Sequence, residues 1–290
     1  MRVLPALIAL SLAALLGAAD FNGSEALEFT KKAVAFGPRP PGSVANRQLR
    51  AYLNTQVRAA GGKLVDDAFT AATPSGRVQM QNVICVFPGT SGRTVVFTGH
   101  FDTKLFPGRH FVGANDGGSS TGLLLELMRA MATTSHKDEI DIVWLDGEEA
   151  FKEWSATDGT YGSRHLSERW ANEGALARIR ALINIDMIGD SGLGIVQELN
   201  SNAALRKLVW QVAAEKGYGK YFLDDTGTLE DDHVPFLKRG VPALDLIDFD
   251  YGPRNSFWHT DKDTIDKLSA HSFQVVGDVL LDLVRRFNSQ

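Results

Sequence analysis

The feature that most constrains this chain is a pair of adjacent carboxylates at the end of an apolar run. Residues 140–145 read Ile-Asp-Ile-Val-Trp-Leu, which is typical of a buried strand, and Asp146-Gly147-Glu148-Glu149 follows at once. Removing an ionised carboxylate from water costs several kcal/mol unless a cation or hydrogen bonds compensate. The Glu148-Glu149 pair therefore predicts a cation site at the end of a central strand.

Further residues of the kind that bind metal ions are spread along the chain, mostly after apolar runs. The sole cysteine, Cys85, lies inside an apolar run, so an intramolecular disulfide is impossible and the ligand set contains only nitrogen and oxygen atoms. Imidazoles and carboxylates without thiolates are typical of a catalytic zinc site, so we predict a zinc hydrolase or transferase. The candidate residues are His100, Asp102, Asp116, Asp186 and His259.

Each candidate also has a simpler interpretation. Glu148-Glu149 could be an exposed pair, Asp116 could cap a helix starting near residue 119, and His259 could be a hydrogen-bonded histidine of the core. The combination of His, Asp and Glu at several strand ends favours a metal site over these separate explanations. For His100, two roles stay open. It could bind a second metal ion, or it could orient the metal ligands by hydrogen bonding without binding the metal itself.

Periodicity predicts an α/β fold with three layers, α/β/α. Strand-like runs alternate with helix-like segments from about residue 82 onward, as in a sheet covered by helices on both faces. The strands expected between residues 64 and 98 are too close in sequence for helical crossovers, so we expect a hairpin there and a mixed, largely parallel sheet overall. In such a sheet the zinc site is expected at the carboxyl ends of the strands. Strands are expected at about 64–69, 82–87, 94–98, 140–145, 181–187 and 241–247, and helices at 24–36, 43–60, 119–134, 161–170, 173–180, 201–216, 232–239 and 269–287.

The first residues of the chain have the pattern of a secretory signal peptide. Residues 1–19 begin with the positive Arg2, continue through an apolar run and end in small residues suited to cleavage. A retained membrane anchor is the alternative, although the run is short for a membrane span. We expect one catalytic domain over residues 20–290, secreted or periplasmic, monomeric and without stable membrane association after cleavage.

The composition of the chain limits which partners this domain could bind. The 290 residues are 44% hydrophobic, which is enough for one large core, and their formal net charge is −5. The chain has no basic cluster beyond short helical pairs, so nucleic acid is not an expected partner.

Taken together, the motifs resemble the co-catalytic zinc aminopeptidase superfamily. That superfamily has the order His-x-Asp, a bridging Asp before a glycine-rich helix start, a Glu-Glu pair, an Asp and a His. Further segments are similar to one of its branches, the glutaminyl-peptide cyclotransferases (glutaminyl cyclases), and the similarity covers roughly residues 25–287. The superfamily order is matched by His100, Asp116, Glu148-Glu149, Asp186 and His259, and the branch motifs are residues 146–154, 161–166, 231–242 and 258–260.

This resemblance implies a role for each candidate. Asp116, Glu149 and His259 would hold one catalytic zinc, with Glu148 as the general acid and base. The other implied site residues are Asp186 and Asp231, which would form an acidic network, and Trp154 and Trp258, which would wall the pocket. The enzyme would convert the N-terminal glutamine of peptides and proteins to pyroglutamate and release ammonia.

The sequence departs from the animal cyclases and leaves two other functions open. It lacks their disulfide, has Asp245 where they have a histidine, and has a longer loop at 248–257, so substrate preference stays open. The runner-up function is a secreted di-zinc aminopeptidase, in which His100 and Asp186 bind a second zinc. The third is a catalytically silent metal-binding domain, which the complete Glu148-Glu149 pair disfavours.

Overall fold

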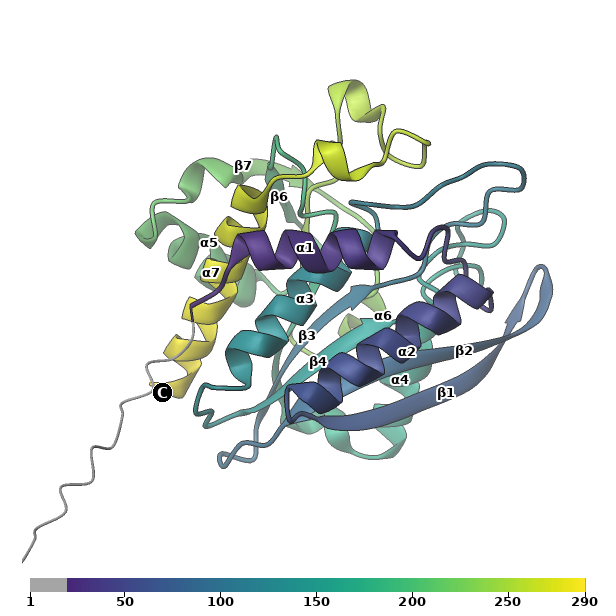
Figure 1. The fold of residues 1–290 in the computed structure, drawn as a ribbon. Coiled ribbons are helices and arrows are strands. Elements are labelled where there is room, and N and C mark those ends of the chain that lie inside the picture. The colour runs from purple at the N-terminus through teal and green to yellow at the C-terminus, as the bar shows by residue number, and fades with distance from the viewer. Residues whose placement is uncertain (1–19, 290) are drawn as a thin grey trace, which may run out of the picture.

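A six-stranded sheet forms the centre of the protein, whose residues 20–289 are described by a computed structural model (Figure 1). The strands lie in the order β1-β2-β4-β3-β5-β8. Their bounds are β1 Lys63–Thr73, β2 Gly76–Phe87, β3 Thr94–His100, β4 Glu139–Leu145, β5 Ile179–Asp186 and β8 Ala243–Ile247.

Strand pairing follows from the lengths of the connections. Strands β1 and β2 form a tight antiparallel hairpin, and β2 also pairs antiparallel with β4. Strands β3, β4, β5 and β8 are mutually parallel, because helical connections return the chain to the same end of the sheet. As a result, the residues at and just after the carboxyl ends of four strands, including His100 and Asp186, gather along one edge.

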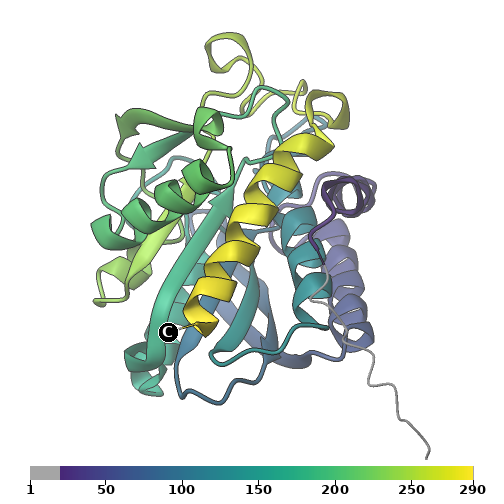
Figure 2. The same cartoon turned by 90° about the vertical axis from the view of Figure 1, so that its left-hand side faces the viewer.

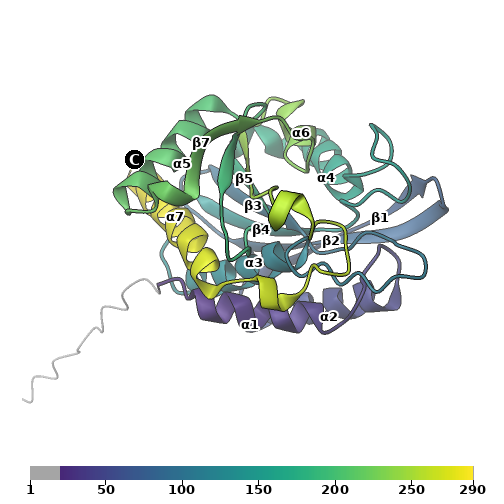
Figure 3. The ribbon, with the colours of Figure 1, turned by 90° about the horizontal axis from the view of Figure 1, so that it is seen from above.

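Helices cover both faces of the sheet, because the central strands are apolar on both sides. Val95 and Phe97 of β3 pack into the larger core cluster, while Val96 between them packs into the opposite one with Leu166 and Phe236. Figures 2 and 3 show the resulting layers. One layer contains α1 Gly23–Val34, α2 Val44–Ala59, α3 Gly118–Met131 and α7 Ala270–Asn288, and the other contains α4 Tyr161–Asn172 and α6 Val234–Leu237.

Helix α5 and a second, small sheet lie beyond the β8 side of the main sheet. Helix α5, Ala203–Glu215, contacts α7 and β8. Strands β6, Ile195–Glu198, and β7, Phe222–Gly227, pair in parallel as a second small sheet. Four short 3-10 helices complete the described elements: Ala175–Arg178, Gly219–Tyr221, Pro253–Asn255 and Ile265–Lys267.

The predicted three-layer α/β fold with a mixed, largely parallel sheet is confirmed. The helix predicted at 173–180 is wrong, because Gly174 takes a φ of 72° after α4 and the apolar run from Ile179 enters β5 instead. The strands β6 and β7 were not predicted, since both are short and only partly buried.

Two predictions concern the ends of the chain and membranes. The signal peptide predicted for residues 1–19 lies outside the described residues. Among the helices that the structure does describe, none combines the length and the apolar character needed to cross a bilayer.

We predict that Gly122→Ala destabilises the fold, because α1 and α3 pack too closely for a side chain there. The added Cβ would lie 2.0 Å from Thr30 Oγ1 and 2.5 Å from the Ala26 carbonyl oxygen. We expect a loss of about 1–3 kcal/mol in the free energy of unfolding, measured by urea denaturation. The control Gly219→Ala, whose Cβ would meet nothing closer than 3.8 Å, should stay within about 0.5 kcal/mol of the parent. Equal effects would contradict the close packing of α1 on α3.

Candidate active site

A cavity of about 520 Å³ opens at the carboxyl ends of the parallel strands. It is lined by every residue predicted for the site from the sequence except His100 and Asp102, which are both buried behind the wall. Apolar and acidic residues make up most of its lining. The predicted residues on its wall are Asp116, Glu148, Glu149, Trp154, Asp186, Asp231, Trp258 and His259, and they are joined by Lys104, Lys152, Glu153, Thr228, Leu229, Glu230, Ile247 and Phe249.

The turn after β4 is held in place by one carboxylate. Asp102 is fully buried and accepts hydrogen bonds from the backbone N–H groups of three successive residues, Gly147 (3.0 Å), Glu148 (3.1 Å) and Glu149 (3.3 Å). Gly147 takes a φ of 80°, a left-handed conformation that glycine adopts at little cost. The backbone is thereby fixed so that both glutamates line the cavity.

Asp146, the first acidic residue of the turn, faces away from the cavity. It accepts hydrogen bonds from Asn46 Nδ2 (2.8 Å) and from the Gln81 backbone N–H (2.9 Å), and it is fully buried. It therefore ties the turn to helix α2 and strand β2. The sequence did not distinguish this structural aspartate from the two glutamates that line the cavity.

Three residues on the cavity wall are arranged to hold a metal ion. His259 Nε2 lies 3.1 Å from Glu149 Oε1 and 3.2 Å from Asp116 Oδ2, and the ligand atoms of the three residues all lie within 4.8 Å of one another. A tetrahedral zinc with ligands at about 2.0–2.2 Å separates neighbouring ligands by roughly 3.4 Å. Apart from its contact with His259, the buried Asp116 Oδ2 has no hydrogen-bond partner among the described residues. The donor set and this poorly satisfied oxygen both fit a bound cation.

The interpretation of Asp116 as a helix cap is wrong. The N-cap of α3 is Gly117, at a φ of 75°, and no side chain caps that helix. The backbone N–H of Asp116 instead donates to Asp263 Oδ2 (3.2 Å), and Asp263 Oδ1 accepts from the Asn115 N–H (2.7 Å). Asp263 thus positions the Asp116 segment from the C-terminal part of the chain.

His259 is fixed by aromatic side chains and by Arg109. Its ring stacks on Trp258 at 4.0 Å between centroids and meets the edges of Phe106 and Phe111 at 5.6 and 5.8 Å. Its backbone takes an unusual φ of 54°, and Arg109 donates to its carbonyl oxygen (3.1 Å). Arg109 also forms an ion pair with Asp261, so it stabilises the turn that carries His259.

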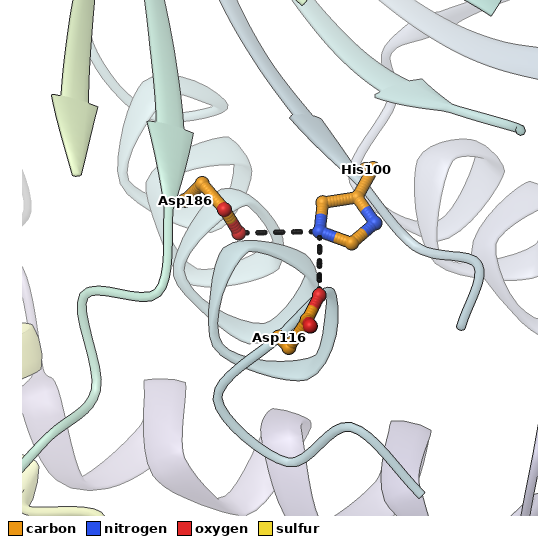
Figure 4. Close-up of side chains that lie close together, drawn as sticks. All are labelled: His100, Asp116 and Asp186. Atoms are coloured by element: carbon orange, nitrogen blue, oxygen red, sulfur yellow. Dashed lines mark hydrogen bonds and ion pairs between the residues drawn. The ribbon is translucent and has the colours of Figure 1, made fainter. Parts of the chain in front are cut away.

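A second group of possible ligands shares Asp116 with the first. His100 Nε2 lies 3.2 Å from Asp116 Oδ1 and 3.1 Å from Asp186 Oδ1. Figure 4 shows the three side chains pointing toward one another. These three side chains could also hold a metal ion. His100 is only 2% exposed and does not line the cavity, whereas Asp186 does. The geometry therefore allows His100 either of its predicted roles.

The site concentrates negative charge in a buried place. Burial raises the pKa of Asp186 to about 7, although His100 opposes the shift. Burial, opposed by His100 and reinforced by Glu149, raises the pKa of Glu148 well above its usual value. Burial lowers the pKa of His259, but its hydrogen bonds with Asp116 and Glu149 outweigh that effect and raise it to about 9. Such a cluster favours any bound cation.

Arg39 is a buried cation whose charge interacts with the carboxylates of Asp102, Asp263 and Asp116. Its guanidinium is fully buried and donates to the carbonyl oxygens of Phe101 (3.1 Å), Val112 (2.7 Å) and Gly113 (3.1 Å). Burial lowers its pKa to about 10, and the charge of Asp102 opposes that shift. Arg39 thus ties together the segments that carry His100 and Asp116, a role that the sequence did not reveal.

Behind the cavity, Asn184 joins two buried carboxylates. Its Nδ2 donates to Asp231 Oδ2 (2.9 Å), which reaches the cavity, and to Asp245 Oδ1 (3.1 Å), which does not. His233 is fully buried and interacts with Glu198 Oε2 (3.2 Å) away from the cavity wall. His233 is therefore a hydrogen-bonded histidine of the core.

Residues 82–284 match the model of peptidase family M28. The chain belongs to peptidase family M28. That match spans β2 to α7 and so includes every residue of both ligand groups.

Similar proteins within this family include named cyclases. The chain is 33% identical to a glutaminyl-peptide cyclotransferase-like protein of Bos taurus over 78% of the chain, and it spans 66% of that relative's length. It is 40% identical to an Acidobacteriales bacterium glutaminyl cyclase of known structure, with a TM-score of 0.90 and coverage of 97% of this chain and 99% of that one. The similarity to glutaminyl cyclases predicted from the motifs is confirmed.

The fold is also that of zinc exopeptidases. A Zn-dependent exopeptidase from Parabacteroides distasonis is 27% identical, with a TM-score of 0.82 and coverage of 92% of this chain and 99% of that one. A named glutaminyl cyclase and a named Zn-dependent exopeptidase therefore share this fold.

We predict that Asp102→Asn destabilises the protein without changing its fold. The amide would present N–H groups to backbone N–H groups, leaving at least one buried donor of the 147–149 turn without an acceptor. The expected loss is about 1–3 kcal/mol in the free energy of unfolding, measured by thermal and urea denaturation. Asp225→Asn, at an exposed position of β7, is the matched control and should change stability little. Equal stability of the two variants would show that the turn does not depend on Asp102.

Proposed function

We propose that the protein is a zinc-dependent glutaminyl-peptide cyclotransferase, an acyltransferase that converts N-terminal glutamine to pyroglutamate with release of ammonia. The observation that carries the proposal is Glu148, a carboxylate that belongs to neither ligand group and lies beside the Asp116, Glu149 and His259 group in a cavity with tryptophans on its wall. The similarity to named glutaminyl cyclases at up to 40% identity supports the choice of reaction.

One zinc ion is proposed at Asp116, Glu149 and His259. All three side chains line the cavity, so an ion there would be reached by substrate, whereas His100 lies behind the wall. Bound zinc would polarise the γ-carbonyl of the substrate glutamine as a Lewis acid. His100 would then orient Asp116 and Asp186 through its two short contacts, at 3.2 and 3.1 Å.

Glu148 is proposed as the group that moves the proton. The substrate's α-amine attacks its own γ-carbonyl carbon, a new N–C bond closes the ring, and the bond to the amide nitrogen breaks. Glu148 takes a proton from the amine and returns it to the departing nitrogen, which leaves as ammonia. Because the Asp102 hydrogen bonds fix the Glu148 backbone, the carboxylate needs little rearrangement for either step.

The other cavity residues are proposed to hold the folded substrate and to exclude water. Asp186 and Asp231 would accept hydrogen bonds from the α-amine, since both carboxylates reach the cavity. Trp154 and Trp258 would wall the glutamine side chain, and Phe249 supports Trp258 at 5.0 Å between ring centroids. Excluding water favours attack by the amine over hydrolysis.

A di-zinc aminopeptidase is the second candidate, and one observation favours it. His100, Asp116 and Asp186 form a second ligand group that shares Asp116 with the first (Figure 4). In that enzyme Glu148 would activate water for hydrolysis. The two candidates differ in metal count and in the nucleophile, so one assay separates them.

We also propose that the enzyme acts outside the cytoplasm, secreted or periplasmic. The support is the pattern of residues 1–19, with a positive start, an apolar run and small residues before a cleavage point.

The test is mass spectrometry of two peptides incubated with the zinc-loaded enzyme. A peptide that begins Gln-Phe should lose one ammonia and keep all its residues, while a matched peptide that begins Leu-Phe should stay intact. Release of free leucine or glutamine would identify an aminopeptidase and contradict the cyclase.

We predict that Glu148→Gln removes most of the turnover and leaves zinc binding intact. An amide cannot accept the amine proton, so kcat should fall by about 10²–10⁴-fold. Zinc content, measured by mass spectrometry of the native protein, should match the parent. Glu173→Gln, an exposed change at the end of α4, is the charge-matched control. Normal turnover of Glu148→Gln would remove Glu148 from the proposed chemistry.

We predict that His259→Ala loses both zinc and the stability that zinc adds. Zinc binds the folded state, so it should raise the parent's free energy of unfolding by about 2.7 kcal/mol when free zinc is 100 times Kd. The variant should show almost none of this gain in thermal melts with and without zinc. His110→Ala, an exposed change in the loop after β3, should keep it. A full zinc response in His259→Ala would exclude this histidine as a ligand.

A further inference from the structure

A second cavity adjoins the first, and nothing in the proposed chemistry uses it. It has a volume of about 280 Å³, slightly below the roughly 300–1,000 Å³ of whole small-molecule sites. Three residues line both cavities, Trp154, Glu230 and Asp231. The size and the shared wall suit part of a ligand whose remainder occupies the larger cavity.

The two cavities differ in charge. The first is acidic: against Lys104 and Lys152 it presents the carboxylates listed at the end of this paragraph. Beyond the shared wall, the second presents Arg164, Lys238 and Arg239 against Glu168 alone. A peptide that runs from the first cavity to the second would therefore pass from an acidic to a basic environment. The carboxylates of the first cavity are Asp116, Glu148, Glu149, Glu153, Asp186, Glu230 and Asp231.

The basic side chains are available to a ligand. Within the part of the chain that the structure describes, Lys238 and Arg239 are exposed and have no carboxylate partner. Arg164 is held on the wall by the carbonyl oxygens of Ala156 and Thr157 at 3.3 Å, and its charge is not neutralised by a carboxylate. These cations come from α4 and from the residues that directly follow α6, two neighbouring elements that both line the cavity.

Trp154 forms the border that a peptide would cross. Its side chain is 41% exposed, which is unusual for such a large apolar residue. An exposed indole between two cavities offers a flat surface over which a peptide backbone can pass.

We propose that the second cavity binds the substrate residues that follow the N-terminal glutamine and favours a carboxylate there. The inference rests on the proposed cyclase function and adds a substrate preference to it. The positive α-amino end lies in the acidic cavity, and a carboxylate in the next two residues meets Arg164, Lys238 and Arg239. The carboxylate can be an acidic side chain or the α-carboxylate of a very short peptide.

The test compares kcat/KM for amidated tetrapeptides. The reference is Gln-Ala-Ala-Ala amide, and the others carry Glu or Lys at the second or third position. Exposed ion pairs contribute little, so Glu should raise kcat/KM by about 2- to 5-fold, mainly through KM, and Lys should lower it by a similar factor. A free-acid Gln-Ala dipeptide beside its amide shows whether an α-carboxylate is bound in the same way.

The double variant K238E/R239E should reverse this preference for the amidated peptides. The control K207E makes the same kind of change on exposed α5, outside both cavities, and should keep the parent's preference. A salt series on the parent enzyme needs no variant: the preference for Glu should shrink as ionic strength rises, because exposed charges are screened.

The outcomes separate the two claims. No cyclisation of any Gln peptide would overturn the proposed function itself. Cyclisation of all the peptides at equal rates, with no difference between free acid and amide and no salt effect, would overturn only the second cavity's role. A preference that K238E/R239E leaves unchanged would also overturn it.

Discussion

The mutual repulsion of buried carboxylates at one edge of the sheet is the constraint on which the site depends. Asp116, Glu149 and Asp186 come from different segments, yet their side chains meet at the carboxyl ends of parallel strands. Their charges are offset in part by His100 and His259, which lie within about 3.2 Å of them. A metal cation at the same place would complete the compensation, which is why we propose zinc at this cluster.

The fold keeps this repulsive cluster together through backbone hydrogen bonds that reach it from outside. Asp102 holds the Glu148-Glu149 turn, Asp263 holds the backbone of Asp116, and Arg109 holds the backbone of His259. None of these three residues belongs to either ligand group of the structure, although Asp102 was a candidate ligand in the sequence. They supply the positional accuracy that a metal site needs, since small displacements of ligands are costly.

Much of the site was predictable from sequence because its residues follow recognisable strands. His100 and Glu148-Glu149 come at or directly after apolar runs, and Asp186 ends one, so the sheet edge could be inferred without coordinates. The roles of Asp102, Arg39 and Asn184 could not be inferred. Their bonds join segments far apart in the chain, and a local pattern carries no information about such partners.

The errors in the fold have a similar origin. The segment 173–180 has a helical composition, but Gly174 and the pairing of Ile179 with Thr94 of β3 decide its conformation. Strands β6 and β7 have few buried residues, and they pair with each other across the intervening α5, so a local pattern does not reveal them.

The central claim is tested most directly by locating the metal. Crystals of the zinc-loaded protein, measured at the zinc absorption edge, should show one anomalous peak within about 2.0–2.2 Å of ligand atoms of Asp116, Glu149 and His259. Such a peak would establish the cation that the carboxylate cluster requires. No peak in the cavity, or a peak bound only by His100 and Asp186, would contradict the account.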